Sequence, residues 1–367
     1  MKIVKQFLSL KKKFFKLSYM KLKNKNIRYL FRLIKMTMNF TNELIESKKD
    51  IYNVCMLFFC LLRQNSKYSL FDSSWIKENF QDLLGVPKYM PIKKLETHTD
   101  GVNPTNVLVN NGIGYSAVKR KDLTNGKIIV WNCSDNSVIT TLDKHDTIVI
   151  SLALHDGKLY SGSFDNTIKV WNCDDNSLIT TLKEHYNFIQ CMTINDGKLY
   201  SASSGNIIVW DCNNYKLIAN VNYGNIFINH MTVSNGKLCF GSGCITVVDL
   251  KDYSVITKIL VKNKSLTFHN DMIFYGTQNG YICVISCKDY SITRNYKLHS
   301  DCISYLTVHN NMLYTCSDDK TICVWSIKDE CIVKRLKKHD REVSYLTIDN
   351  GKLYSSDILG NVINWKI

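Results

Sequence analysis

The chain has 367 residues, of which 45% are hydrophobic and 22% charged, a composition typical of a soluble globular protein with ample length for a buried core. The net charge of +15 is unevenly placed, because residues 1–35 hold 12 Lys or Arg and no acidic residue. That leaves 35 basic and 32 acidic residues in 36–367, a nearly neutral body. No apolar run approaches the length of about 20 residues that a membrane span needs, so no transmembrane segment is expected.

Residues 1–38 are predicted to be a basic, disordered extension. Stretches such as KKKFFKL (11–17) mix Lys with Phe and Leu, a pattern that could also bind nucleic acid or an anionic membrane surface. We favour the extension over either binding role for residues 1–35. Lys2, Lys5 and Lys11–Lys13 interrupt any apolar core of a signal peptide, so secretion is not expected.

Residues 39–88 are predicted to be helical. Apolar residues recur on one broad face of 50–64, and a second amphipathic stretch, 75–84, ends at Gly85 with Pro87 beyond, a normal helix stop. This region could be a short adaptor module. The other interpretation, which we favour, is that these helices pack beside the domain that follows.

A repeat dominates the remainder, 89–367. WNCSDNSVITTLDKH (131–145) and WNCDDNSLITTLKEH (171–185) match at 11 of 15 positions. The pattern continues at spacings of 40, 39, 38, 37, 40 and 40 residues, which indicates seven units. The anchor positions of the units are Trp131, Trp171, Trp210, Val248, Ile285, Trp325 and Trp365.

Each unit is predicted to contain four short strands. In the unit after His145, TIVISLALH, KLYSGS, NTIKVWNC and SLITTL have the alternating, β-branched character of strands. Asp156-Gly157 predicts a tight turn between the first two, since type I′ turns need positive φ. Equivalent turns are predicted at Asp196-Gly197, Asn235-Gly236 and Asn350-Gly351, with weaker versions at Asn110-Asn111, Asn270-Asp271 and Asn310-Asn311.

The succession of His, strand, Asp-Gly turn, Ser-x-Ser-x-Asp and Trp resembles the WD-repeat β-propeller family. The resemblance covers about three quarters of the chain and implies an all-β, seven-bladed ring after the short helical region. Only Trp210-Asp211 is literally the dipeptide of the family's name, and Val248 and Ile285 replace the aromatic anchor. The last unit lacks a fourth strand, so the strand in 91–97 is expected to complete it and close the ring.

Two units contain a set of side chains that, taken alone, suggests a serine hydrolase. In YSGSFDNTIKVW (160–171), Ser161 and Asp165 follow His145, the three residue types of a catalytic triad. The set recurs, however, and a triad is needed only once. The resemblance implies instead that these side chains form a structural hydrogen-bond network within a blade. The two complete tetrads are His145, Ser161, Asp165 and Trp171, and His299, Thr315, Asp319 and Trp325.

Two further units contain partial tetrads. His185, Ser201 and Trp210 have Ser204 and Gly205 where the aspartate is expected. His339, Ser355 and Trp365 have Leu359 at that position.

No other motif supports catalysis. There is no P-loop, GxGxxG or HExxH motif and no CxxC pair with zinc spacing, so we predict no enzyme activity, catalytic residue, cofactor or metal site. Four of the 14 cysteines, Cys133, Cys173, Cys212 and Cys287, recur at one offset in different units, which favours free thiols and an intracellular, cytoplasmic protein.

The sequence thus predicts a scaffold that binds a protein or peptide partner. By resemblance, the partner site is the face that carries the loops before the first strands and between the second and third strands. Candidate contacts on that face are Phe164, Tyr186, Phe188, Ser300, Asp301, Asp318 and Arg341. The alternative is a substrate-recruiting adaptor of a ubiquitin ligase with residues 39–88 as a BTB- or F-box-type module, although no F-box signature is visible.

Overall fold

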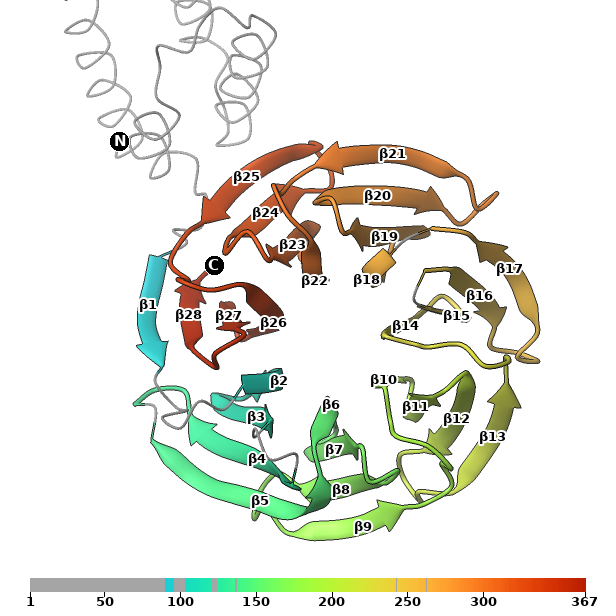
Figure 1. Cartoon of the computed structure of the whole chain (residues 1–367), viewed down its shortest axis with the longest axis vertical. Helices are drawn as coiled ribbons and strands as arrows, with labels where there is room; N and C mark the ends of the chain where they lie inside the picture. The colour runs from blue at the N-terminus through green and yellow to red at the C-terminus, as the bar shows by residue number, and fades with distance from the viewer. Residues whose placement is uncertain (1–89, 96–102, 120–123, 136, 242, 262) are drawn as a thin grey trace, which may run out of the picture. The chain divides into compact units, whose positions relative to one another are not determined.

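The computed structural model describes residues 90–95, 103–119, 124–135, 137–241, 243–261 and 263–367. The basic extension and the helical region predicted for residues 1–38 and 39–88 lie outside these ranges. Residues 89–367 form a compact unit of their own. In the described residues the chain forms 28 strands in seven four-stranded antiparallel sheets, arranged as blades around a central axis (Figure 1). The predicted seven-bladed ring is therefore confirmed.

The first strand of each blade lies at the centre of the ring, and each contacts the first strands of its two neighbours (Figure 1). These strands are β2 (Asn103–Asn110), β6 (Val149–His155), β10 (Cys191–Asn195), β14 (His230–Ser234), β18 (Asn263–His269), β22 (Ile303–His309) and β26 (Val343–Asp349). The second strands are β3 (Ile113–Lys119), β7 (Lys158–Ser163), β11 (Lys198–Ser203), β15 (Lys237–Gly241), β19 (Met272–Thr277), β23 (Met312–Ser317) and β27 (Lys352–Asp357).

The third and fourth strands lie progressively further out. The third strands are β4 (Thr124–Asn132), β8 (Ile168–Asn172), β12 (Asn206–Asp211), β16 (Ile245–Asp249), β20 (Tyr281–Ser286), β24 (Ile322–Ser326) and β28 (Val362–Lys366). The fourth strands are β5 (Val138–Thr147), β9 (Leu178–Leu182), β13 (Leu217–Asn222), β17 (Val255–Ile259), β21 (Ile292–Lys297), β25 (Cys331–Leu336) and β1 (Met90–Leu95). Blade 1 is β2 to β5, and the blades are numbered in chain order up to blade 7, which contains β26 to β28 and β1.

The ring is closed by its N-terminal strand. β1 pairs antiparallel with β28, from Met90 opposite Lys366 to Leu95 opposite Val362. In Figure 1 the cyan strand β1 therefore lies beside the dark red strand β28 in one blade. This pairing gives the last three strands a fourth and leaves blade 7 no worse protected at its edge than the other blades.

The turns between first and second strands all place two consecutive residues at positive φ, which is the type I′ geometry that suits a twisted hairpin. Asp156 and Gly157, for example, have φ of 46° and 65°. Blade 6 manages the turn without glycine, using Asn310 and Asn311 at 48° and 58°. In blade 1 the turn residues are Asn111 and Gly112. The prediction of Asn110-Asn111 was thus one residue out of register.

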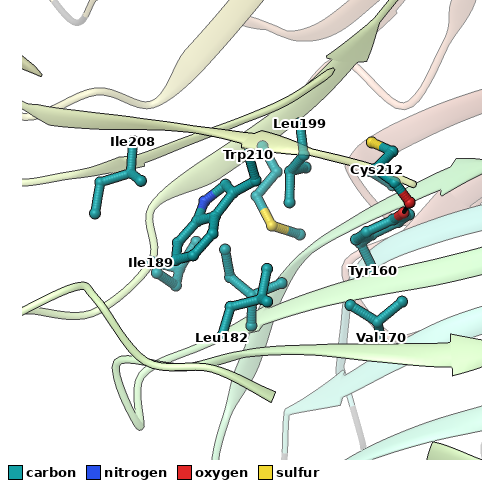
Figure 2. Close-up of a cluster of buried hydrophobic side chains, with 11 residues drawn as sticks. Tyr160, Val170, Leu182, Ile189, Leu199, Ile208, Trp210 and Cys212 are labelled. Atoms are coloured by element: carbon teal, nitrogen blue, oxygen red, sulfur yellow. Dashed lines mark hydrogen bonds between the residues drawn. The ribbon is translucent and has the colours of Figure 1, made fainter. Parts of the chain in front are cut away.

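A separate cluster of buried hydrophobic side chains fills each of the seven contacts between neighbouring blades of the described ring. Figure 2 shows the cluster between blades 2 and 3, where Trp210 of β12 packs with Leu182 of β9 and Ile189. The third-strand anchor of every blade lies in the cluster shared with the preceding blade. In blades 4 and 5, Val248 and Ile285 take this place and are completely buried.

The recurring cysteines also belong to these contacts. The Tyr160 hydroxyl of blade 2 donates a hydrogen bond to the Cys212 carbonyl of blade 3 at 3.4 Å, and both are labelled in Figure 2. Cys133 lies beside Tyr354 of blade 7, and burial raises the pKa of its thiol to about 12. All 12 cysteines in the described part of the chain are free thiols. A thiol with so high a pKa is a poor nucleophile, so Cys133 acts as a small core residue.

Candidate functional site

The tetrad of blade 2 is a buried, continuous hydrogen-bond network. The Trp171 indole N–H donates to Ser161 Oγ at 2.8 Å, and Ser161 Oγ lies 2.8 Å from His145 Nε2. His145 Nδ1 lies 2.7 Å from Asp165 Oδ2. Since an ionised carboxylate only accepts, the N–H of His145 Nδ1 donates to Asp165. The network joins the strand before the blade, the second strand, the following turn and the third strand.

The ionised form of Asp165 is stabilised by its hydrogen-bond partners. Burial alone would raise the pKa of this carboxyl, but the hydrogen bond and charge of His145, with further hydrogen bonds from Thr167, hold the pKa well below its usual value. Asp165 Oδ1 accepts from the Thr167 hydroxyl at 2.6 Å and its backbone N–H at 2.9 Å. Asp165 Oδ2 also accepts from the Asp146 N–H. The carboxylate thereby pins the turn after β7 to the end of β5.

The same geometry makes Ser161 unsuited to nucleophilic attack. Its side chain is completely buried, and its oxygen already accepts the Trp171 indole. A substrate carbonyl has no path to this oxygen without displacing Trp171, which is 3% exposed.

Blade 6 reproduces the tetrad only in part. His299 Nε2 lies 2.8 Å from Thr315 Oγ1, and Nδ1 lies 2.9 Å from Asp319 Oδ2. No hydrogen bond among the described residues joins the Trp325 indole to Thr315. Trp325 packs instead against Tyr296, with ring centroids 4.9 Å apart. The fourth member is therefore a packing residue here.

Blade 7 completes its tetrad with a residue that the spacing did not identify. His339 Nε2 lies 2.7 Å from Ser355 Oγ, which accepts from the Trp365 indole at 2.7 Å. His339 Nδ1 lies 3.2 Å from Asp357 Oδ2 at the end of β27, two residues before Leu359. Asp357 also accepts from the backbone N–H groups of Leu359 and Asn361, both at 3.0 Å. Asp357 thus takes the part that Asp165 has in blade 2.

Blade 3 lacks this aspartate altogether. His185 Nε2 lies 2.7 Å from Ser201 Oγ, and the Trp210 indole donates to the same oxygen at 2.9 Å. His185 Nδ1 is buried without a hydrogen-bond partner. Burial lowers the pKa of His185 to about 4, so its imidazole is neutral near pH 7. In blade 1 the Trp131 indole donates to Ser116 Oγ at 2.9 Å, and that blade's histidine position, residue 98, lies outside the described residues.

Three aromatic rings from consecutive blades meet on the face that carries the loops between blades. Phe164 follows β7 of blade 2, Phe188 precedes β10 of blade 3, and Phe227 precedes β14 of blade 4. The ring centroids of Phe164 and Phe188 are 4.6 Å apart, and those of Phe188 and Phe227 are 6.3 Å apart. We call these three residues the phenylalanine cluster.

The outer members of the phenylalanine cluster are open to solvent. Phe164 is 44% exposed and Phe227 54% exposed, while Phe188 between them is half-buried. Tyr186, in the same loop as Phe188, is 91% exposed. The structure therefore brings together two of the aromatic residues predicted for the partner face, Phe164 and Phe188, and adds Phe227.

The four polar candidates lie apart from this cluster, on blades 6 and 7. Asp318 accepts the Ser304 hydroxyl and lies 3.7 Å from Lys264 Nζ. The Ser300 N–H donates to Asp319 at 3.0 Å, and Asp301 accepts the Cys302 N–H at 2.7 Å. These three residues are thus engaged by other residues of blades 5 and 6, whereas Arg341 is an exposed residue in the loop before β26.

Comparison with known proteins identifies the repeat. A family model described as "WD domain, G-beta repeat" matches residues 136–172, 176–211 and 290–326. Each match runs from the fourth strand of one blade through the third strand of the next, and each contains one of the buried histidines, His145, His185 or His299. The chain is a WD-repeat β-propeller protein.

Other comparisons address only the fold of this WD-repeat propeller. A crystal structure of the computationally designed Ika8 protein is similar, with a TM-score of 0.60 and 22% sequence identity over 74% of this chain and 85% of that one. At this level of identity the likeness shows the fold alone. No match was found among curated proteins.

The described part of the WD-repeat propeller offers few groups for chemistry. No three His, Cys, Asp or Glu side chains gather there in a way that could hold a metal ion. Nor does any described residue belong to a helix that could cross a membrane. WD-repeat propellers generally serve as protein-interaction scaffolds, so the loops of the ring are the place to look for function.

Proposed function

We propose that this protein is a non-enzymatic, intracellular scaffold that binds a protein or peptide partner through its loop face. The observation that carries the proposal is the phenylalanine cluster, Phe164, Phe188 and Phe227. Aromatic side chains that stand exposed on a rigid support are the residues that most often anchor protein interfaces. The free thiols of the described cysteines support a reducing compartment.

The sheets beneath the cluster explain why the rings can act as preformed anchors. Gln190 is 6% exposed, and its Oε1 accepts from the Ser204 N–H at 3.2 Å and the Ile228 N–H at 3.0 Å. Blade 3 is thereby tied to the loop that carries Phe227. Anchors that are already held in place lose little conformational entropy on binding, which favours affinity.

A matched pair of variants tests the proposal. The loop-face variant combines Phe164→Ser, Tyr186→Ser and Phe227→Ser. The outer-strand variant combines Val138→Ser, Ile179→Ser and Ile292→Ser, which lie on β5, β9 and β21 and are 42% to 52% exposed. Both variants remove exposed apolar side chains from the full chain, but only the first removes them from the loop face.

The measurement is the affinity for a partner that is isolated with the wild-type protein, identified and purified. We expect the loop-face variant to bind it at least about tenfold more weakly, and the outer-strand variant to bind it as wild type does. A third variant, Asp301→Ala with Arg341→Ala, tests the charged half of the face. The proposal is wrong if neither loop variant changes the affinity for the partner.

The ubiquitin-ligase alternative depends on residues 39–88, which lie outside the described residues, and no structural observation favours it. Co-purification with the full chain and with a chain that lacks residues 1–88 separates the two functions. Loss of cullin-type partners on truncation would support the alternative, and their absence from both samples would remove it.

A further inference from the structure

We infer that the partner segment recognised by the phenylalanine cluster is uncharged and carries aromatic or large aliphatic anchor side chains. This inference rests on the proposed function, because it specifies the partner of the same face. It commits to a protein segment of this chemistry rather than to an acidic, basic or phosphorylated one.

The first argument is the absence of charged residues from the two chain stretches that carry Phe188 and Phe227. The two loops that carry Phe188 and Phe227 belong to residues 185–195 and 217–236, and neither stretch contains Asp, Glu, Lys or Arg. His185 at the start of the first stretch is buried, and its pKa of about 4 leaves it neutral at physiological pH.

The carboxylate next to Phe164 in the chain is already hydrogen-bonded within the blade. Asp165 follows Phe164 directly, but each of its two oxygens accepts two hydrogen bonds. His145, Asp146 and Thr167 supply the donors. The carboxylate therefore has no lone-pair direction left that would favour a lysine or arginine of a partner over a neutral side chain.

The lack of charged groups in these loops favours a partner segment without charged side chains. A charged side chain that is desolvated against three phenyl rings loses its hydration and gains no compensating ion pair, so its burial there is costly. A phosphorylated motif would need arginine donors, which these loops do not contain. An apolar, uncharged segment loses only weakly held water on the same surface and gains ring contacts.

The other half of the loop face shows the contrast. Around blades 5 to 7 the charged residues include Lys264 of β18 and the loop residues Asp301, Asp318 and Arg341, and Lys264 Nζ lies 3.7 Å from Asp318 Oδ2. A charged motif would find more charged partners there than in the loops of Phe188 and Phe227. The two halves of one face thus offer different chemistry, and Phe188 and Phe227 lie in stretches without charged residues.

The test uses random peptides displayed on phage and selected on the full-length wild-type protein. Individual enriched peptides are then synthesised, and their affinities are measured for wild type, the loop-face variant, the outer-strand variant and the charged-loop variant Asp301→Ala/Arg341→Ala. Vesicles of phosphatidylcholine serve as a second probe, because a neutral lipid surface could also cover exposed phenyl rings.

The expected result is enrichment of peptides that contain aromatic residues, Leu or Ile and few charged residues. Their affinity should fall at least about tenfold for the loop-face variant and stay within about twofold for the outer-strand variant. If the charged-loop variant keeps the wild-type affinity, the peptides bind at the phenylalanine cluster and not at the loops of blades 6 and 7.

Four results would overturn the inference. Enriched peptides that are charged and lose affinity only for the charged-loop variant would contradict it while leaving the proposed loop-face function intact. Peptides whose affinity is the same for wild type and for both loop variants would contradict the proposed function as well. Enrichment no greater than on the loop-face variant, or vesicle binding that depends on Phe164, Tyr186 and Phe227, would show that the cluster does not select a peptide.

Discussion

The amide oxygen of Gln190 accepts a hydrogen bond from the backbone N–H of Ile228 at 3.0 Å, which joins the core of blade 3 to the loop of blade 4. The same oxygen accepts from the Ser204 N–H. One buried side chain therefore satisfies two loop N–H groups on either side of a blade boundary. Phe188 lies two residues before Gln190 and Phe227 directly precedes Ile228, so this bridge positions two members of the phenylalanine cluster.

Gln190→Leu should destabilise the propeller and loosen the loop of Phe227. The substitution keeps the side-chain bulk but leaves the N–H groups of Ser204 and Ile228 without an acceptor, at about 1–3 kcal/mol for each group that stays buried. Urea denaturation measures the loss of unfolding free energy. Gln278→Leu, at an exposed turn residue of blade 5, is the matched control and should change the free energy by less than about 0.5 kcal/mol. Equal stability of the two variants would contradict the bridging role.

Asp357→Ala should be among the most destabilising single changes in blade 7. Asp357 is 1% exposed and accepts hydrogen bonds from His339, Asn361 and the Leu359 N–H, all of which lose an acceptor. We expect a loss of more than about 2 kcal/mol in the free energy of unfolding. Leu359→Ala, at the position where blades 2 and 6 have their aspartate, is 43% exposed and should cost less than about 1 kcal/mol. The reverse order of the two values would show that Asp357 does not complete the tetrad.

Asp357 and Leu359 show which features of the blades the sequence could predict and which it could not. The period, the turn residues and the spare strand before the first unit were sufficient to predict seven blades and their closure. Spacing could not identify Asp357, because it occupies the place of Ser163 at the end of the second strand and reaches the histidine from there. A hydrogen bond depends on where the donor and acceptor atoms lie in space. A spacing rule fixes only a position in the sequence, and side chains from two different positions can reach the same histidine.

Phe227 was missed for a related reason. Blade 4 has Val248 in place of tryptophan and no histidine at the start of the blade, so the repeat gave no register for the preceding loop. Phe164 and Phe188 could be placed because His145 and His185 fix the loops of blades 2 and 3. Only the fold shows that the three loops converge. An exposed aromatic residue in an uncharged stretch was the available signal, but it did not indicate which residues would be its neighbours.

The stability of the protein should fall as the pH is lowered from about 6.5 to about 4, in part because of His185. In the folded state burial lowers the pKa of His185 to about 4, while in the unfolded chain it has the ordinary value of about 6.5. Between these values the unfolded state binds the proton and the folded state does not, so acidification favours unfolding. Burial lowers the pKa of His230 to about 4 as well, and it acts in the same window.

Urea denaturation across this pH range measures the effect. His185→Gln should flatten the dependence of the unfolding free energy on pH, whatever its effect on absolute stability. Gln278→Leu, which removes no titratable group, is the control and should keep the wild-type slope. An unchanged slope for His185→Gln would mean that the pKa of His185 is the same in the folded and unfolded states.

Ser161→Ala separates a blade-building network from a catalytic one. Ser161 is completely buried, and its removal leaves the Trp171 indole N–H without its acceptor and His145 Nε2 without its hydrogen-bond partner. We expect a loss of about 1–3 kcal/mol for each group left unsatisfied, measured by denaturation, with partner affinity unchanged. Ser177→Ala removes a hydroxyl that bonds to Asp175 in an exposed turn, and it should leave stability within about 0.5 kcal/mol of wild type. A Ser161→Ala protein that melts like wild type but loses a hydrolytic activity would reverse the assignment, because only a reacting serine is dispensable for folding and essential for chemistry.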